Sequence, residues 1–203
     1  MYLLVEFNLE IIHQISQPLL YNYLMDYYKK QLFLAEVDKD DNILSKIERW
    51  DAHKKGVLHR GFTMILTYKG KIILQHRKHL AFDGYFDLTF SSHQIYFYDV
   101  LQTDEDAING TLKREWNIDA SGIKSIPKYL GKFYYKAKDP NSIFTEHEID
   151  YIYIAELKNL PNPNPDFAYG FKLIEKKELL TTNYNLQPKH FAPWINEILK
   201  MII

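Results

Sequence analysis

The sequence predicts an α+β fold, with one domain and a helical segment before it. Segments with the composition of strands are interrupted by a few helical segments, and the two kinds do not alternate as regular strand–helix–strand units. A chain of 203 residues is long enough for one sizeable core and short for two. Its 46% hydrophobic and 25% charged residues argue against a disordered chain.

The first predicted element is a helix over residues 9–30, with a possible break at Pro18. Apolar and aromatic residues recur there at three- and four-residue intervals, which is typical of an amphipathic helix packed on a domain. We therefore expect residues 1–32 to form a helical extension packed on a domain that spans residues 33–203.

Strands are predicted next. A short apolar run at residues 33–37 stops at a turn-like sequence over residues 38–42. Residues 62–68 and 71–75 are both apolar and are separated by a lysine and Gly70. This pattern predicts a β-hairpin closed at Gly70, because glycine adopts the backbone conformation that a tight hairpin turn requires.

A second helix is predicted over residues 104–118. Apolar side chains recur there at helical intervals, and Asp104 can cap the N-terminus. Two later segments are rich in tyrosine and isoleucine, as strands are. We expect strands at residues 128–137 and 147–157, a segment leading out of the sheet at 171–180, and a C-terminal helix at 191–203 entered through Pro188 and Pro193.

Charge and cysteine content exclude several classes of function. The net charge of −1 gives no reason to expect a nucleic acid or an anionic membrane as partner. The absence of cysteine excludes disulfides, zinc–thiolate sites and a cysteine nucleophile. The first residues lack the positive start of a signal peptide, and no apolar run approaches the ~20 residues of a membrane span. A cytoplasmic protein is the expectation; whether it is a monomer or a homodimer stays open.

Three histidines and two glutamates are the candidate metal ligands. Glu146 and Glu148 are one residue apart in a predicted strand, so both carboxylates leave the same face and repel unless a cation lies between them. With His53, His59 and His93 they would make a nitrogen–oxygen shell suited to Mn²⁺, Zn²⁺ or Fe²⁺, whereas Mg²⁺ prefers oxygen alone. Spacing does not bring these positions together, and solvent-facing side chains are the ordinary alternative.

An ordered set of segments resembles the type I isopentenyl-diphosphate isomerases of the Nudix superfamily. The similarity covers about residues 33 to 200, in order and at near-family spacing. The segments are residues 48–62, 74–77, 84–93, Asp106-Ala107 with Glu115, 133–148 and 191–194. The resemblance implies a Nudix fold, in which a mixed β-sheet is sandwiched between helices.

The resemblance also implies a site and a small-molecule diphosphate substrate. One divalent metal would be held by the five candidate ligands, and Glu115 would help Mg²⁺ meet the substrate diphosphate. Glu148 and Tyr135 would lie at the proton-transfer centre. Trp194 would offer a ring face to a cationic intermediate, while Arg49 and Arg77 fall near positions that bind diphosphate. Core packing is the alternative role for Tyr135 and Trp194.

The departures from the family pattern concern the reacting groups. Ser91 stands where the isomerases carry a catalytic cysteine, and a hydroxyl is a far poorer acid than a thiol. Two basic phosphate contacts are replaced, by His79 and Thr111, and Asp83-Gly84 replaces the usual Pro-Gly. Isomerase activity remains the first hypothesis, because the matched residues are those that isomerisation uses. Ser91 is expected to impair that activity.

Two other functions stay open. The first is a Nudix hydrolase acting on another diphosphate. When the hydrolase motif is registered on Ile118, Gly110-Thr111 stand at its Arg-Glu pair and Arg114-Glu115 at its Glu-Glu pair, and only Glu115 survives. Too few carboxylates remain to hold two or three Mg²⁺ ions and activate water. The second is a catalytically silent protein that keeps the metal and diphosphate pocket.

Overall fold

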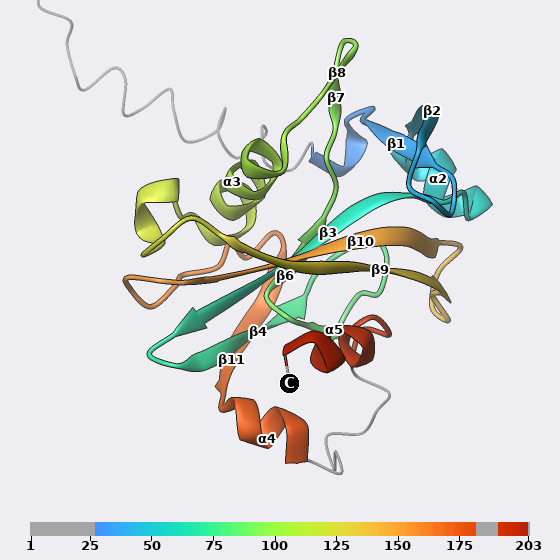
Figure 1. Ribbon diagram of the computed structural model, residues 1–203. Coiled ribbons are helices and arrows are strands. Elements are labelled where there is room, and N and C mark those ends of the chain that lie inside the picture. The colour runs from blue at the N-terminus through green and yellow to red at the C-terminus, as the bar shows by residue number, and fades with distance from the viewer. Residues whose placement is uncertain (1–26, 182–190, 203) are drawn as a thin grey trace, which may run out of the picture. The chain divides into compact units, whose positions relative to one another are not determined.

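The computed structural model describes residues 27–181 and 191–202 (Figure 1). The chain divides into two compact units, residues 1–31 and 32–203. The described part of the first unit contains the 3-10 helix η1 (Tyr27–Lys29), where the rings of Tyr27 and Tyr28 meet edge to face at 5.5 Å between centroids. The rest of the predicted N-terminal helix lies outside the described residues, so the packed extension stays a prediction.

A mixed sheet forms the centre of the second unit. Its main path runs β11–β4–β3–β1–β2, and β10 pairs with both β3 and β9. The β10–β3 pair is parallel, whereas the other main pairs are antiparallel. The strands are β1 (Phe33–Val37), β2 (Ile43–Glu48), β3 (His59–Tyr68), β4 (Lys71–Arg77), β5 (Phe86–Asp87), β6 (Phe90–Ser92), β9 (Lys128–Lys138), β10 (Thr145–Glu156) and β11 (Ala168–Ile174), with β7 (Tyr96–Phe97) and β8 (Val100–Leu101) forming a separate hairpin.

The predicted hairpin is present as β3 and β4. Tyr68 pairs with Lys71, and the two residues between them have positive φ angles, 49° at Lys69 and 78° at Gly70. Positive φ at both positions is the geometry of a tight turn that matches the twist of the strands. The predicted strands at 33–37, 128–137 and 147–157 are also present, as β1, β9 and β10.

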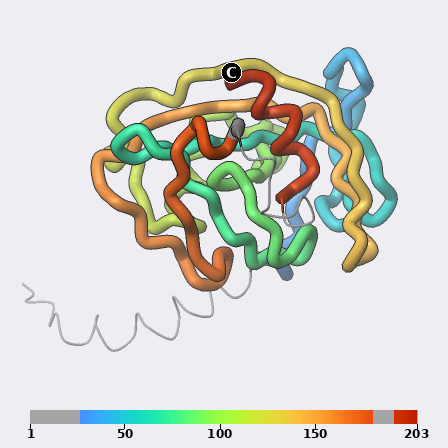
Figure 2. The backbone as a smooth tube through the Cα atoms, turned by 90° about the horizontal axis from the view of Figure 1, so that it is seen from below, coloured from blue at the N-terminus to red at the C-terminus, as the bar shows by residue number. Residues whose placement is uncertain are grey.

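Helices cover both faces of the sheet because apolar side chains alternate along β3. Phe62, Met64 and Leu66 face one side, where they pack with Leu112 and Trp116 of α3 (Asp104–Trp116). Ile65 faces the other side and packs with Ile195 and Ile198 of α5 (Ile195–Ile202). Figure 2 shows this C-terminal segment beside β9. The mixed sheet sandwiched between helices is therefore confirmed.

Two sequence predictions are wrong in detail. Thr103, not Asp104, caps α3: its backbone is extended and its hydroxyl accepts from the Asp106 amide at 3.1 Å. The Asp104 carboxylate instead accepts from Gln94, in the segment after β6, and from Tyr153 of β10. The segment predicted to leave the sheet contains strand β11, because the free side of β4 supplies it with backbone partners, and α4 (Lys176–Thr181) follows.

Two short helical elements were not predicted. They are α2 (Arg49–Lys55) and the 3-10 helix η2 (Ala120–Gly122). The C-terminal helix starts at Ile195, and Pro188 lies outside the described residues. Among the helices in the described residues, none has the length and hydrophobicity that a membrane crossing needs.

Candidate metal centre and active site

The five candidate metal ligands converge in space. Their ligand atoms all lie within 4.8 Å of one another, and four of the five side chains are buried, His93 being half-buried. His53 comes from α2, His59 from the start of β3 and His93 from the segment after β6, while Glu146 and Glu148 come from β10. The fold thus brings together ligands from three parts of the chain, which lie near positions 53–59, 93 and 146–148.

Local structure explains how each ligand reaches this place. The Glu48 side chain caps α2 by accepting from the Asp51 amide, and Gly56 ends the helix with a left-handed φ of 62°. This short helix carries His53 and returns the chain to β3. The parallel pairing of β10 with β3 then sets Glu148 opposite His59. Since side chains alternate along a strand, Glu146 leaves the same face as Glu148.

Backbone carbonyls orient two of the imidazoles. The Nδ1 atom of His53 lies 2.6 Å from the Arg49 carbonyl oxygen, and that of His59 lies 2.8 Å from the Val57 carbonyl oxygen. A carbonyl accepts only, so each Nδ1 donates and each Nε2 faces the cluster. A second hydrogen bond of this kind is how metal-binding histidines are usually held.

The charges in the cluster are paired. Burial acts to lower the pKa of His53, but the carboxylate of Glu146, 3.1 Å away, outweighs it and raises the pKa to about 9. Burial lowers the pKa of His93 to about 4. Burial acts to raise the pKa of Glu148, yet the hydrogen bonds from His59 and His93 hold it well below its usual range. Burial also acts to raise the pKa of Glu146, but the charge of His53 outweighs it and lowers that pKa, so both glutamates are carboxylates at neutral pH.

The donor set fits a divalent transition metal. Three imidazole nitrogens and two carboxylate oxygens are ligands that Mn²⁺, Zn²⁺ and Fe²⁺ accept. The two carboxylates lie side by side on one strand face, an arrangement that a cation between them stabilises. The protein supplies the ligands preoriented, because the histidine rings are fixed from behind.

Tyr135 joins this cluster from the neighbouring strand. It is the cross-strand partner of Glu148 in the β9–β10 pair, and its hydroxyl donates to Glu148 Oε2 at 2.5 Å. Burial and then the charge of Glu148 raise the pKa of Tyr135 well above its usual value, so the phenol keeps its proton. The Trp194 ring lies 5.6 Å from the Tyr135 ring between centroids.

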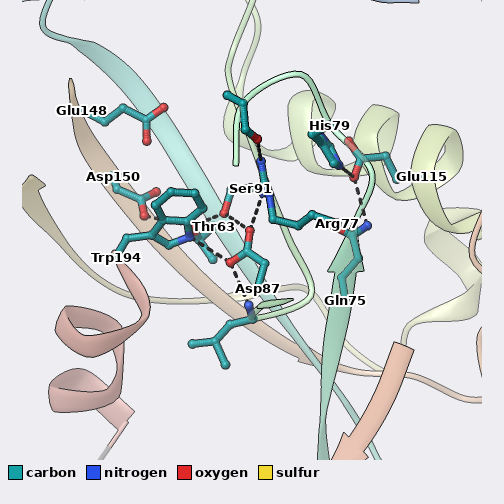
Figure 3. A network of polar contacts seen from close by, with 12 residues as sticks. Thr63, Gln75, Arg77, His79, Asp87, Ser91, Glu115, Glu148, Asp150 and Trp194 are labelled. Carbon is teal, nitrogen blue, oxygen red and sulfur yellow. Dashed lines mark hydrogen bonds and ion pairs between the residues drawn. The ribbon is translucent and has the colours of Figure 1, made fainter. Parts of the chain in front are cut away.

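Ser91 lies in a buried polar network beside the cluster (Figure 3). Its hydroxyl donates to Asp87 Oδ2 at 2.9 Å and lies 2.8 Å from the Thr63 hydroxyl. Thr63 in turn donates to Asp150 Oδ2 at 2.9 Å. Burial, and then the charge of Glu148, raise the pKa of Asp150 well above its usual range.

The remaining predicted residues lie outside the five-ligand cluster. Arg77 is buried and binds Asp87 at 2.7 Å, and its guanidinium lies over the Trp194 ring. Arg49 is buried on α2, with its guanidinium 4.2 Å from the centre of the neighbouring Trp50 ring.

Glu115 has its own basic surroundings. Burial raises its pKa, and its neighbours include Gln75, Arg114 at 3.0 Å and His79 at 3.7 Å. The pKa of His79 is well below its usual value, first through burial and then through the nearby charges of Arg77, Arg114 and Arg49. Glu115 is therefore surrounded by basic side chains and lies outside the five-ligand cluster.

Sequence reasoning missed Asp87, Thr63 and Asp150. Asp150 continues the period-two series of Glu146 and Glu148, which was a usable signal. Asp87 and Thr63 carry no such signal, because only the pairing of β6 with β3 and the return of the chain at Trp194 bring their partners to them.

Curated relatives identify the family. The isopentenyl-diphosphate Delta-isomerase 1 of Bos taurus is 32% identical over 155 residues, a match that spans 71% of this chain and 65% of the bovine protein's length. That of Mesocricetus auratus is 30% identical over 158 residues and spans 70% of this chain and 69% of the hamster protein. This chain belongs to the isopentenyl-diphosphate isomerase family.

The fold agrees with the superfamily of the resemblance. A MutT NUDIX hydrolase from Burkholderia pseudomallei superposes with a TM-score of 0.53 at 18% identity, covering 72% of this chain and 98% of the other. The predicted family and the predicted Nudix fold are therefore both confirmed. No protein-family model matches the chain.

Gly61 is expected to be required for the site, because a side chain there would displace the carboxylate of Glu148. A Cβ atom at Gly61 would lie 2.6 Å from Cδ of Glu148. We expect Gly61→Ala to displace the carboxylate and to lower turnover by about 100-fold, since small misplacements of a reacting group cost rates of that order. Steady-state kinetics and metal titration would measure it.

Gly110→Ala is the matched control, because nothing lies within 4 Å of a Cβ at this helical position. It should raise the free energy of unfolding by about 0.5–1 kcal/mol and leave turnover unchanged. Wild-type kinetics in Gly61→Ala would show that Glu148 does not need its position over Gly61.

Proposed function

We propose that this protein is an isopentenyl-diphosphate Delta-isomerase. The reaction adds a proton to the terminal CH₂ carbon of isopentenyl diphosphate, which gives a tertiary carbocation. Loss of a proton from the adjacent chain carbon then gives the internal double bond of dimethylallyl diphosphate. The observation that carries the proposal is the Tyr135–Glu148 hydrogen bond at 2.5 Å, inside a cluster of buried histidines and glutamates.

The proton-transfer roles follow from this geometry. Glu148 is held by His59 and His93 on one side and receives the Tyr135 hydroxyl on the other. The Tyr135–Glu148 pair would hold and move the proton at one face of the substrate. Ser91, on β6, would take part at the opposite face.

Aromatic and basic side chains would bind the rest of the substrate. The Trp194 ring, buried next to Tyr135, would stabilise the carbocation through its π face. Arg49, Arg77 and Glu115 would lie on the diphosphate side, the arginines by charge and Glu115 by helping to hold Mg²⁺.

The five-ligand cluster would hold one divalent metal, Mn²⁺, Zn²⁺ or Fe²⁺. When bound, such an ion neutralises the paired carboxylates and fixes the orientation of Glu148. His53, His59, His93, Glu146 and Glu148 would be its ligands.

Ser91→Cys is expected to raise isomerase turnover by about tenfold or more, because a thiol with a pKa near ~8.5 exchanges protons far more readily than an aliphatic hydroxyl. The chain contains no cysteine, so the new thiol is unique and its identity can be checked by mass after alkylation. Ser92→Cys, one residue along β6, is the control. No gain in Ser91→Cys would mean that the pocket differs from the family by more than this residue.

Proton NMR in D₂O, with purified protein, Mg²⁺ and isopentenyl diphosphate, tests the function directly. Phosphate release is assayed in the same sample. Dimethylallyl diphosphate carrying deuterium supports the isomerase. Phosphate without the isomer would indicate a hydrolase, and absence of both products would indicate a silent binding protein.

A further inference from the structure

Asp87 accepts four hydrogen bonds at the centre of the network in Figure 3. Its side chain is fully buried. Oδ2 accepts from Arg77 Nη1 at 2.7 Å and from Ser91 Oγ at 2.9 Å. Oδ1 accepts from the Trp194 indole and from the Leu88 amide, both at 2.8 Å. One buried carboxylate thus contacts three of the side chains to which the proposed reaction assigns a role.

The donors around Asp87 fix the direction of the Ser91 hydroxyl. An indole, a backbone amide and a guanidinium can only donate, so they satisfy Asp87 without offering it an acceptor. A carboxylate ion-paired with Arg77 accepts only, so the Ser91 hydrogen points at Asp87 Oδ2. The Ser91 oxygen keeps a lone pair for another donor.

We propose that Asp87 is the base behind Ser91, in an inference that rests on the isomerase function proposed above. A proton leaves the chain carbon next to the carbocation and bonds to Ser91 Oγ, while the original Ser91 proton passes to Asp87 Oδ2. The electron pair of the broken C–H bond becomes the new double bond, and the Asp87 carboxylate becomes a carboxylic acid. After the product has left, Asp87 returns its proton through Ser91 to solvent, and the Tyr135–Glu148 pair regains from solvent the proton that it gave to the substrate.

This relay explains how the chain could act with Ser91 in place of the catalytic cysteine of its family. An aliphatic hydroxyl ionises too weakly to act by itself at neutral pH. In a relay the hydroxyl gains one proton as it loses another, so the oxygen never carries a full charge, and the carboxylate takes the proton. Ser91 would then work because Asp87 lies 2.9 Å from it.

A double-mutant cycle tests the relay. Asp87→Asn keeps the size of the side chain and one acceptor oxygen, but its NH₂ group cannot take a proton. We expect Asp87→Asn and Ser91→Ala each to lower kcat by about 100-fold, and the double variant to fall no further than about threefold beyond Ser91→Ala. Effects on kcat that multiply would overturn the relay. A change in KM alone would also overturn the relay, because it would show that Asp87 only positions Arg77.

Asp41→Asn is the matched control. Asp41 is also a buried aspartate paired with an arginine, Arg60, at 2.6 Å. It has a φ of 68°, which asparagine tolerates, and it lies among Arg60, Lys132 and Tyr151 instead of the site residues. Its kcat should stay within about threefold of wild type, because losing a buried ion pair there changes stability alone. A kcat loss equal to that of Asp87→Asn would overturn the relay.

A substrate-free readout separates this inference from the isomerase function. In Ser91→Cys the single thiol of the chain faces Asp87, and a neighbouring carboxylate disfavours the thiolate. Iodoacetamide at pH 7 should therefore alkylate Ser91→Cys/Asp87→Asn about fivefold faster than Ser91→Cys. Equal rates would overturn the inference. If the two alkylation rates differ fivefold but the wild-type protein does not turn over isopentenyl diphosphate, the proposed isomerase function is wrong. The result would still show that Asp87 affects the protonation of the side chain at position 91.

Discussion

Glu148→Gln is expected to lower the isomerase kcat by about 1,000-fold while leaving the fold intact, because it removes a carboxylate that exchanges protons at the reacting carbon. Glutamine keeps the size of the side chain but cannot accept a proton from Tyr135. The change also removes a charged acceptor from His59 and His93, which hold Glu148 at 3.4 and 2.8 Å. Loss of metal affinity should accompany the loss of turnover.

Glu156→Gln provides the comparison on the same strand. Glu156 lies at the far end of β10 and pairs with Lys124 at 2.6 Å, away from the cluster. Its turnover should match wild type. Deuterium incorporation followed by NMR, together with circular dichroism, distinguishes a chemical defect from a folding defect. Unchanged turnover in Glu148→Gln would mean that the proton-transfer centre lies elsewhere.

Metal affinity is expected to rise by about 100-fold between pH 7 and pH 9, because a proton on His53 competes with the metal. In the metal-free protein burial acts to lower the pKa of His53, but Glu146 raises it to about 9. Below that pH the imidazole is protonated and cannot bind a metal. Affinity is therefore lowest in acid, rises about tenfold per pH unit, and levels off above pH 9. The pKa of His93, lowered to about 4 by burial, keeps it out of this range.

Isothermal titration with Mn²⁺ or Zn²⁺ measures this competition. Below pH 9 about one proton should be released per metal bound, visible as a dependence of the observed heat on the ionisation enthalpy of the buffer. His76→Gln is the control, because His76 stacks on Phe86 away from the cluster and should not change the slope. An affinity that stays constant from pH 7 to 9 would show that His53 is neutral or does not bind the ion.

The types of the main elements could be predicted from the sequence because their signals are local. The β3–β4 hairpin follows from two apolar runs around Gly70, and α3 follows from helical periodicity. The N-terminal cap of α3 could not be predicted in this way, because Thr103 and Asp104 are both favourable capping residues. The hydrogen bonds of Asp104 with Gln94 and Tyr153 leave Thr103 as the cap. Strand β11 was missed because its partner β4 lies about 100 residues earlier in the chain.

The candidate site divides in the same way. The sequence by itself determined that Glu146 and Glu148 share one strand face, since side chains alternate with a period of two, and the ordered motifs singled out the three histidines. Only the tertiary structure decided that all five meet within 4.8 Å, that Glu115 lies apart from them, and that Asp87 lies behind Ser91. The physical reason is that alternation and helical periodicity act between near neighbours, whereas strand register and core packing choose which distant polar groups are buried together.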